Sequence, residues 1–295
     1  MEKYTQNEVL LQVKKVCGSL QLSLHHNWIG PKIYSQHQMI ALLTLKAREN
    51  KSLRRFVAWL YETKWPEVLG LKAIPSYSSI YRAMKRLGMN VLRKINFAII
   101  STLRSSIKGI DGSGFQMQHR SRHYEKRANL EYLPNGKLDI VGDLTYFLID
   151  DWHFAVKERH DVLAAKRMMK RSEHVANIDL WADKGYDCEE LHELSFAKGF
   201  NLLAPTRRST RKRPKGRFRR IVDEKIKSKP KYERAKVETI FSILKRVYGE
   251  TIRSQKPHMK KREMAWKIIA LNIEKVLMHL FYWLFFKPFE TEPIE

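Results

Sequence analysis

Three acidic residues stand beside apolar runs in separate parts of the chain. Asp111 lies in the segment IDGSGF, Asp183 ends the apolar run of IDLWADKGYD, and Glu238 comes from a later helical segment. Carboxylates that converge from separate elements can hold two divalent cations about 3.5–4 Å apart, which is the arrangement that phosphodiester chemistry uses. Hard oxygen ligands select Mg²⁺ or Mn²⁺. We therefore predict that Asp111, Asp183 and Glu238 form a two-metal site that acts on nucleic acid.

The segment around Glu238 has the pattern of an amphipathic helix. Its apolar stripe consists of Val237, Ile240, Phe241, Leu244, Val247 and Tyr248. Arg234, Glu238 and Lys245 fall on one line along the edge of that stripe when residues are placed at about 100° intervals. We predict that Glu238 binds metal while Arg234 and Lys245 contact phosphates on the same face of the helix.

The overall charge also points to a polyanionic partner. The chain has 56 Lys and Arg residues against 31 Asp and Glu residues, a net charge of +25 and an isoelectric point near 10.0. Nucleic acid is the first candidate for such a partner. The run RRSTRKRPKGRFRR contains no acid, and we predict DNA-backbone contacts from Arg207, Arg208, Arg211, Lys212 and Arg213. Such contacts give salt-dependent affinity and little sequence reading; the alternative is a nuclear localisation signal.

Residues 1–105 are predicted to be mostly helical, with apolar spacings of three and four in HQMIALLTLKAREN, KSLRRFVAWLYE and SYSSIYRAMKRLG. In the third segment Ser76 is expected to cap the helix and Gly88 to end it. Arg82, Lys85 and Arg86 then face outward, as a DNA-recognition helix requires. The alternative is an ordinary surface helix of a very basic protein.

From Ile107 the pattern changes to short strands. KGIDGSGFQM, KLDIVGDLTYFLI and WHFAVKER predict a three-stranded antiparallel meander, with turns at Pro134–Gly136 and at Asp150–Asp151. The following order of helix, strand, helix, strand and helix predicts one mixed α/β sheet flanked by helices. In this scheme Asp139, Asp143, Asp150 and Asp151 are strand-edge and turn acids, Asp161 caps a helix, and Trp152 and Trp181 belong to the core.

Composition excludes several other classes of protein. A chain of 295 residues with 43% hydrophobic residues can bury a sizeable core. Cys17 and Cys188 lack the spacing of a disulfide framework or a zinc site. The first fifteen residues contain no apolar core of signal-peptide type, so we expect a cytoplasmic protein. The apolar segment VLMHLFYWLFF is too short to span a membrane and is expected to be a buried helix.

At these acidic segments the sequence resembles a known family. IDGSGF, ADKGYD and the pattern R-x-x-x-E-x-x-F-x-x-L-K resemble the three acidic blocks of DDE transposases encoded by insertion sequences, of the IS4/IS5 type. The similarity runs in order from about Ile110 to Gly249, and PSYSSIYRAMKRLG resembles the region that precedes the catalytic domain. The resemblance implies an RNase H-like catalytic core, two Mg²⁺ ions, and DNA strand transfer at terminal inverted repeats, with a dimer assembled on paired DNA ends.

Position by position, Asp111, Asp183 and Glu238 match the three acids of that family. Arg234 and Lys245 match its accessory basic positions, whereas Tyr232 is displaced by one residue from the usual tyrosine. Asp187 lies one turn from Asp183 and is the alternative for the second acid.

The predicted organisation is a helical DNA-binding region at 1–105, an RNase H-like DDE catalytic domain at 106–287 with a basic insertion at 206–231, and a tail at 288–295. The predicted function is a metal-dependent DNA transposase. Two alternatives use the same residues differently: a metal-dependent nuclease without strand transfer, and a non-catalytic basic DNA-binding regulator derived from a transposase.

Overall fold

The structure is a computed structural model that describes residues 6–26, 32–117, 127, 135–156, 160–175, 177–206, 216–227 and 235–286. The N-terminal part contains the helices α1 (Gln6–Ser19), α2 (Gln36–Arg48), α3 (Leu53–Tyr61), α4 (Trp65–Val68), α5 (Tyr77–Arg86) and α6 (Met89–Ile100). The strands and helices that follow are β1 (Ile107–Gln116), β2 (Asn135–Asp143), β3 (Leu148–Ala155), α8 (Asp161–Arg171), β4 (Ile178–Ala182), the short 3₁₀ helix η1 (Lys184–Tyr186), α9 (Glu189–Ala197) and β5 (Phe200–Leu203). The last three helices are α10 (Arg217–Lys227), α11 (Ala235–Tyr248) and α12 (Pro257–Phe286).

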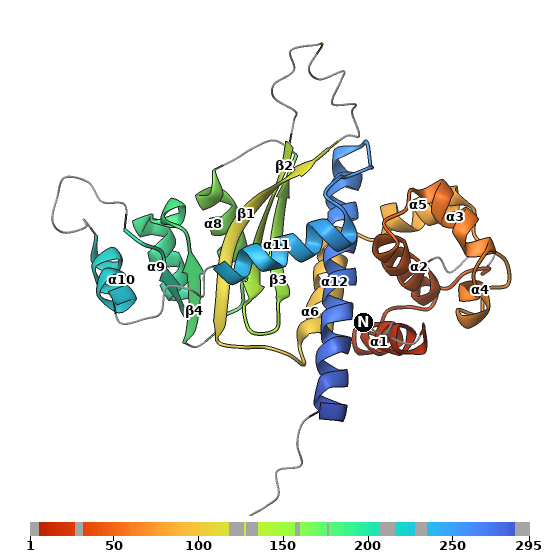
Figure 1. Ribbon diagram of the computed structural model, residues 1–295, viewed down its shortest axis with the longest axis horizontal. Helices are drawn as coiled ribbons and strands as arrows, with labels where there is room; N and C mark the ends of the chain where they lie inside the picture. Colours follow the sequence, from red (N-terminus) through yellow and green to blue (C-terminus); the bar gives the residue numbers. More distant parts are fainter. Residues whose placement is uncertain are drawn as a thin grey trace, which may run out of the picture.

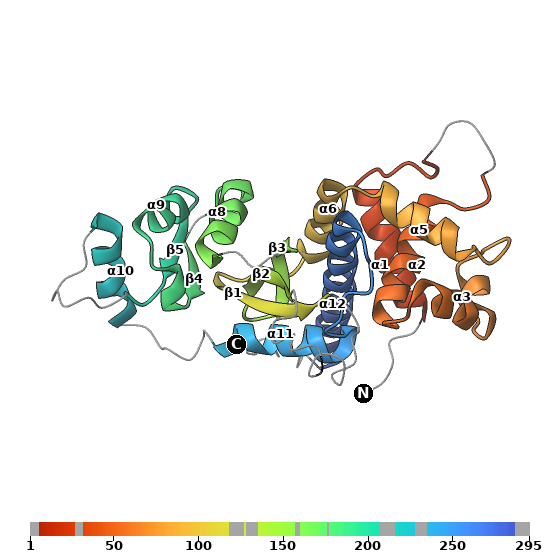
Figure 2. The same cartoon turned by 90° about the horizontal axis from the view of Figure 1, so that it is seen from above.

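One five-stranded sheet with the order β3-β2-β1-β4-β5 forms the centre of the second part. β1, β2 and β3 are antiparallel, while β4 and β5 run parallel to β1 and to each other. Helix α11 covers one face of this sheet and α8 covers the other, as Figures 1 and 2 show from two directions. The predicted mixed α/β class and the antiparallel meander are confirmed, and the strand order is that of an RNase H-like core.

Two glycines allow α11 to lie close against the sheet. Gly109 of β1 pairs with Gly142 of β2. A Cβ atom added at Gly109 would lie 2.2 Å from Val237 Cγ2, and one added at Gly142 would lie 2.6 Å from Ile240 Cδ1. Real Cβ atoms do not approach other atoms so closely, so these contacts require glycine. The apolar stripe predicted for α11 therefore packs on β1 and β2 through Val237 and Ile240. Phe241, Leu244 and Tyr248 of the stripe are also buried, but the prediction is wrong for Val247, which is 50% exposed.

Helix α12 joins the N-terminal helices to the sheet. It packs against α2 and α6 on one side and against β3 on the other. Asn272 of α12 accepts a hydrogen bond from Ile149 N at 2.9 Å and donates to Asn96 Oδ1 of α6 at 2.7 Å. Asn96 in turn donates to Ile149 O at 2.9 Å. A buried amide network thus connects α6, β3 and α12, and one apolar cluster runs through all three.

The predicted burial of the C-terminal helix holds as far as Leu277. Val276 is fully buried, whereas Phe281 and Tyr282 are exposed. Among the described residues, no helix has the length and apolarity that crossing a membrane requires. Trp152 and Trp181 are buried in the core, as predicted.

The three helices predicted in the N-terminal part correspond to α2, α3 and α5. Ser76 caps α5, since Ser76 Oγ accepts a hydrogen bond from Ser79 N at 3.2 Å. Arg86 is the last residue of α5, and Gly88 occupies the N-cap position of α6 instead of ending α5. The first strand begins at Ile107, after α6 has ended at Ile100.

The turn between β2 and β3 differs from the prediction. It lies at residues 144–147, so Asp150 and Asp151 are within β3. The turn is held by Asp143, whose Oδ1 accepts hydrogen bonds from Thr145 N and Tyr146 N, both at 3.0 Å. A carboxylate can organise a turn in this way without glycine or proline. Because β2 lies between β1 and β3, Asp139 and Asp143 are also not edge residues, and both are buried.

One helix was not predicted, and one further expectation is corrected. The segment between β5 and α11 contains a helix, α10, whose Val222 is buried. Asp161 is the first residue of α8 and not its cap; His160 holds the cap position, and the Asp161 carboxylate pairs with Lys137 instead.

We expect the substitution Gly109→Ala to lower the free energy of unfolding by about 1–3 kcal/mol, because the new methyl group overpacks the contact with Val237. Val237 is β-branched and cannot rotate away easily within a helix. Gly114→Ala in the same strand is the control, since no described atom lies within 4 Å of a Cβ at that position. Urea unfolding of both variants checks this, and equal stabilities would contradict the proposed constraint.

Candidate functional site

Asp111 and Asp183 belong to two neighbouring parallel strands: Asp111 lies within β1, and Asp183 directly follows β4. β1 and β4 pair in parallel from Ile107 with Asp179 to Ile110 with Ala182. One residue further along this register, Asp111 stands opposite Asp183. Neighbouring strands are about 4.7–4.9 Å apart, and residues in register point to the same face of the sheet. By this register the two aspartates point to the same face of the sheet, although β1 continues to Gln116 and β4 ends at Ala182.

The face that they share is the one that α11 covers. Gly109, two residues before Asp111, contacts Val237 of α11. Trp181, two residues before Asp183, belongs to the same apolar cluster as Val237. Because every second residue of a strand faces the same side, both aspartates face α11.

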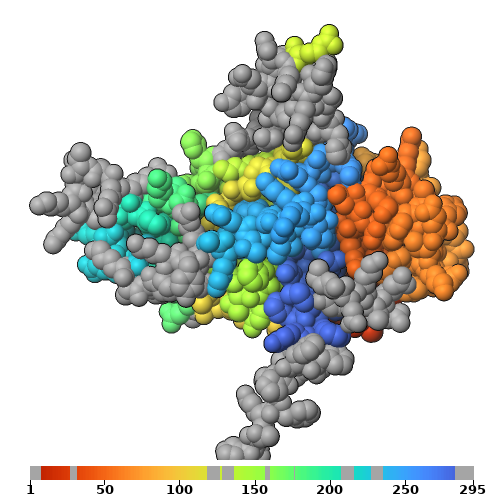
Figure 3. All heavy atoms as spheres, viewed as in Figure 1, coloured from red at the N-terminus to blue at the C-terminus, as the bar shows by residue number. Residues whose placement is uncertain are grey.

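Glu238 follows Val237 on α11 and is exposed, as the helical pattern predicted. Figure 3 shows α11 across the middle of this face of the molecule, between the N-terminal helices and the α9–α10 end. The sheet and α11 thus bring all three predicted acids to one side. Within the described residues, no three His, Cys, Asp or Glu side chains lie close enough to form a complete metal site.

Backbone hydrogen bonds orient the two aspartates. Asp111 Oδ1 accepts from Gly112 N at 2.8 Å, and Asp183 Oδ1 accepts from Lys184 N at 2.7 Å at the start of η1. Two adjacent carboxylates on one face supply the hard oxygen donors that Mg²⁺ or Mn²⁺ prefers, so this donor set fits a divalent cation.

Asp187, the alternative second acid, has a different environment. Its side chain is fully buried, and Arg219 Nε donates to Asp187 Oδ1 at 2.7 Å while Arg219 NH2 donates to Oδ2. His192 Nε2 lies 3.4 Å from the same carboxylate. This pairing connects α10 to the segment before α9, which is a structural use of the acid. The geometry favours Asp183 over Asp187 as the exposed acid beside Asp111.

A buried carboxyl that the sequence patterns did not single out lies behind this pair. Asp139 of β2 is opposite Gly112 and is 2% exposed. Among the described residues, its Oδ1 and the hydroxyl of Tyr186 have no hydrogen-bond partner. Burial raises the pKa of Asp139 to about 7; Lys137 opposes this change, whereas Asp161 and Asp111 reinforce it. The prediction that Asp139 is a strand-edge acid is therefore wrong. Gly112 pairs with Asp139 and has no side chain, so it leaves room for the Asp139 carboxyl; this glycine is the sequence signal that could have indicated the buried position.

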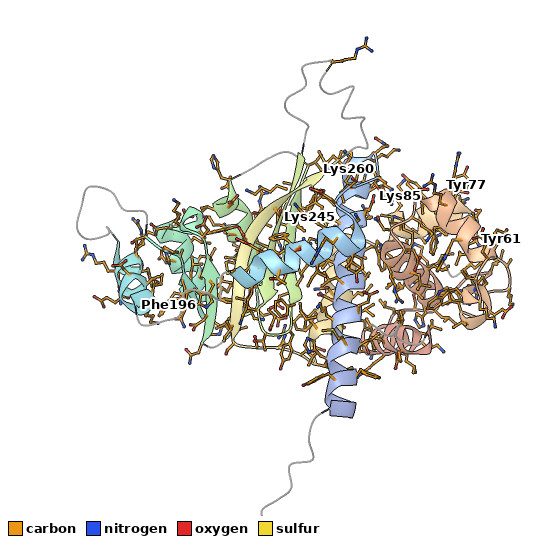
Figure 4. The ribbon with its side chains drawn as sticks, in the orientation of Figure 1. Tyr61, Tyr77, Lys85, Phe196, Lys245 and Lys260 are labelled. Carbon is orange, nitrogen blue, oxygen red and sulfur yellow. The ribbon has the colours of Figure 1, made fainter. Side chains whose placement is uncertain are left out.

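The predicted basic residues fall into three groups. Lys245 lies near β1, with Nζ 5.3 Å from the centre of the Phe115 ring and 3.7 Å from Glu250 Oε1. Arg82, Lys85 and Arg86 are exposed on α5, at a distance from the sheet that Figures 1 and 4 make visible. The third group lies outside the described residues and consists of Arg207, Arg208, Arg211, Lys212, Arg213 and Arg234, together with Tyr232.

We expect Asp187→Asn to lower the free energy of unfolding by about 3 kcal/mol, because it leaves the Arg219 guanidinium without its buried counter-charge. Asp183→Asn is the matched control, since asparagine caps a helix as well as aspartate does. Its unfolding free energy should change by less than about 1 kcal/mol. Thermal unfolding compares the two variants, and the reverse order of stabilities would show that the two roles are exchanged.

Comparisons with known proteins identify the family to which the chain belongs. A profile of the family described as "Transposase DDE domain" matches residues 104–273, which is more than half of the chain. No curated protein matches the chain. Among solved structures, a piggyBac transposase synaptic complex with hairpin DNA is similar, with 10% sequence identity and a TM-score of 0.43 over 93% of this chain and 73% of that chain. On the strength of the family profile, the chain belongs to the transposase DDE domain family.

Proposed function

We propose that this protein is a metal-dependent DNA transposase that binds the ends of its element and catalyses strand cleavage and strand transfer. The observation that carries the proposal is the register of β1 and β4, which sets Asp111 beside Asp183 beneath α11 in a chain of the DDE family. Transposases of this family generally use divalent metal ions.

In the proposed site Asp111, Asp183 and Glu238 would hold two Mg²⁺ or Mn²⁺ ions. When bound, such ions activate the attacking oxygen and stabilise the leaving oxygen of a phosphodiester. The sheet would hold the two aspartates, and α11, which covers the face that they share, would supply the glutamate. Lys245, and Arg234 by the helical pattern, would contact phosphates beside Glu238. Water attack at the element end and attack of the freed 3′-hydroxyl on target DNA then use the same residues.

The proposed partner is double-stranded DNA, first as terminal inverted repeats and then as target. The net charge of +25 supports attraction to DNA, and exposed Arg82, Lys85 and Arg86 on α5 support a role of this helix in binding. Pairing of two element ends suggests a homodimer on DNA, in the cytoplasm of the host cell.

We expect Asp111→Asn, Asp183→Asn and Glu238→Gln each to reduce metal-dependent cleavage more than about 100-fold, because loss of even an outer partner of a metal ligand lowers activity 10–100-fold. DNA affinity should change little, since the basic surface stays intact. The measurement uses DNA that carries the natural flanks of the gene, with Mg²⁺ or Mn²⁺. Glu193→Gln, at an exposed position of α9, is the control for loss of one negative charge.

The reaction products decide between the proposal and its alternatives. Joined DNA products that disappear in Asp111→Asn support a transposase. Cut DNA without joined products indicates a nuclease that uses the same acids. An Asp111→Asn protein that cuts as well as the wild type contradicts the site, and binding without any metal-dependent cutting indicates a regulator.

A further inference from the structure

A cleft lies where the N-terminal helices meet the segment that joins α11 to α12. Its volume is about 410 Å³, and α3, α5 and residues 253–263 contribute most of its walls. The side chains that matter here are Lys46, Arg54, Tyr77, Lys256 and Glu263. None of them belongs to the carboxylate site, and none is among the residues that the sequence assigned to DNA.

Positive charge dominates this cleft. Arg54 and Lys256 are exposed on walls formed by α3 and by the residue before α12. Lys46 lies deeper and is 8% exposed; burial lowers its pKa, and nearby Glu263 opposes that effect. Glu263 is itself buried and accepts hydrogen bonds from Arg253 N at 3.0 Å and Ser254 N at 2.7 Å. The Glu263 carboxylate therefore interacts with groups inside the protein and does not neutralise Arg54 and Lys256 at the mouth of the cleft.

Further cations crowd the same edge. The end of α5 lies close to α12, since Arg262 Nε donates a hydrogen bond to Leu87 O at 3.0 Å. Partial desolvation, followed by the charges of Arg262, Lys256 and Lys85, lowers the pKa of His258 at the same edge. The first turn of α12 contains no acidic residue. Positive side chains at the positive end of a helix dipole repel it, so an anion at this edge would relieve an unfavourable arrangement.

The cleft lies on the way from α5 to the carboxylates. Figure 4 shows Lys85 beside the start of α12, Tyr77 further out on α5, and Lys245 over the sheet. The segment that forms one wall begins at Thr251, which forms an isolated β-bridge with Gln116 at the end of β1. DNA that contacts α5 near Tyr77 and Lys85 and extends toward β1 would therefore pass over this cleft, whereas Arg82 and Arg86 line a different pocket.

We propose that the cleft binds the sugar-phosphate backbone of double-stranded DNA, with Arg54 and Lys256 contacting phosphates. This inference rests on the proposed function and adds the surface between the recognition helix and the site of cleavage. Tyr77 is 48% exposed, but Arg54 lies over its ring at 5.3 Å from the centroid. Because the guanidinium already covers part of that ring, phosphate contact is favoured over the stacking of an unpaired base.

The test measures the salt dependence of binding to a duplex made from the gene flanks and to an unrelated duplex of equal length. Each lost phosphate contact reduces the slope of log K against log salt by about 0.9. The double variant Arg54→Gln/Lys256→Gln should therefore lower the slope by about two on both duplexes. Arg55→Gln/Lys15→Gln is the matched control, since both positions are exposed and neither lines the cleft. The control should leave the slope at the wild-type value.

Three results would overturn the proposal. Equal slopes for the double variant and its control would mean that the cleft does not contact DNA. If Tyr77→Ala weakens binding only to DNA with an unpaired terminal nucleotide, while Tyr61→Ala has no effect, the occupant is a displaced nucleotide and not a duplex. If the wild-type protein binds no DNA, the proposed function and this inference both fail. If the wild-type protein cleaves DNA but the double variant keeps the wild-type slope, only the inference about the cleft fails.

Discussion

The close approach of α11 to the sheet is the constraint on which the candidate site depends. A helix normally rests on a sheet at the distance set by the side chains between them. Here two paired glycines, Gly109 and Gly142, remove those side chains, so Val237 and Ile240 contact the backbone of β1 and β2. The position of Glu238 follows directly, because it is the residue next to Val237. A carboxylate on a helix can serve together with carboxylates on strands only if that helix has one fixed height above the sheet.

The sheet itself contributes the other half of the arrangement. Parallel pairing aligns the end of β4 with the middle of β1, a strand some seventy residues earlier in the sequence. The last pair, Ile110 with Ala182, directly precedes Asp111 and Asp183. Tyr186 and Asp139 occupy the space behind them, where burial and the neighbouring Asp161 and Asp111 charges raise the pKa of Asp139 to about 7, against the opposing effect of Lys137. A carboxyl that is about half protonated near neutral pH adds less repulsion to the pair than a fully ionised one would.

Many of the helices and strands could be predicted from the sequence, because the patterns that indicate them lie within short segments. Short β-type runs of residues predicted β1 and β4, the helical period of about 3.6 predicted α11, and Ser76 predicted the start of α5. The turn between β2 and β3 could not be predicted, since Asp143 organises it through hydrogen bonds to Thr145 and Tyr146 instead of through glycine or proline. The burial of Asp139 could not be predicted either, because it depends on the neighbouring strand β1 and on Gly112. Helix α10 was not predicted because it follows directly on the basic run and is itself rich in basic residues. The catalytic roles of Asp111, Asp183 and Glu238 stay predictions, whereas the face that they share is now a matter of geometry.

Helix α12 has a consequence for how far apart the two ends of the protein can act. Its thirty residues make a rod of about 45 Å, and the Asn96–Asn272 network locks α6 and β3 to its side. No soft linker separates α5 from the strands in this arrangement, since α12 and the shared apolar core join them. A duplex gripped by the N-terminal helices would then meet Asp111 at a set number of base pairs from the grip. Because α12 lies crosswise between the N-terminal helices and the sheet (Figure 1), its packing, and not its length, would set the distance between DNA held on α5 and the bond cut at Asp111 under the proposed function.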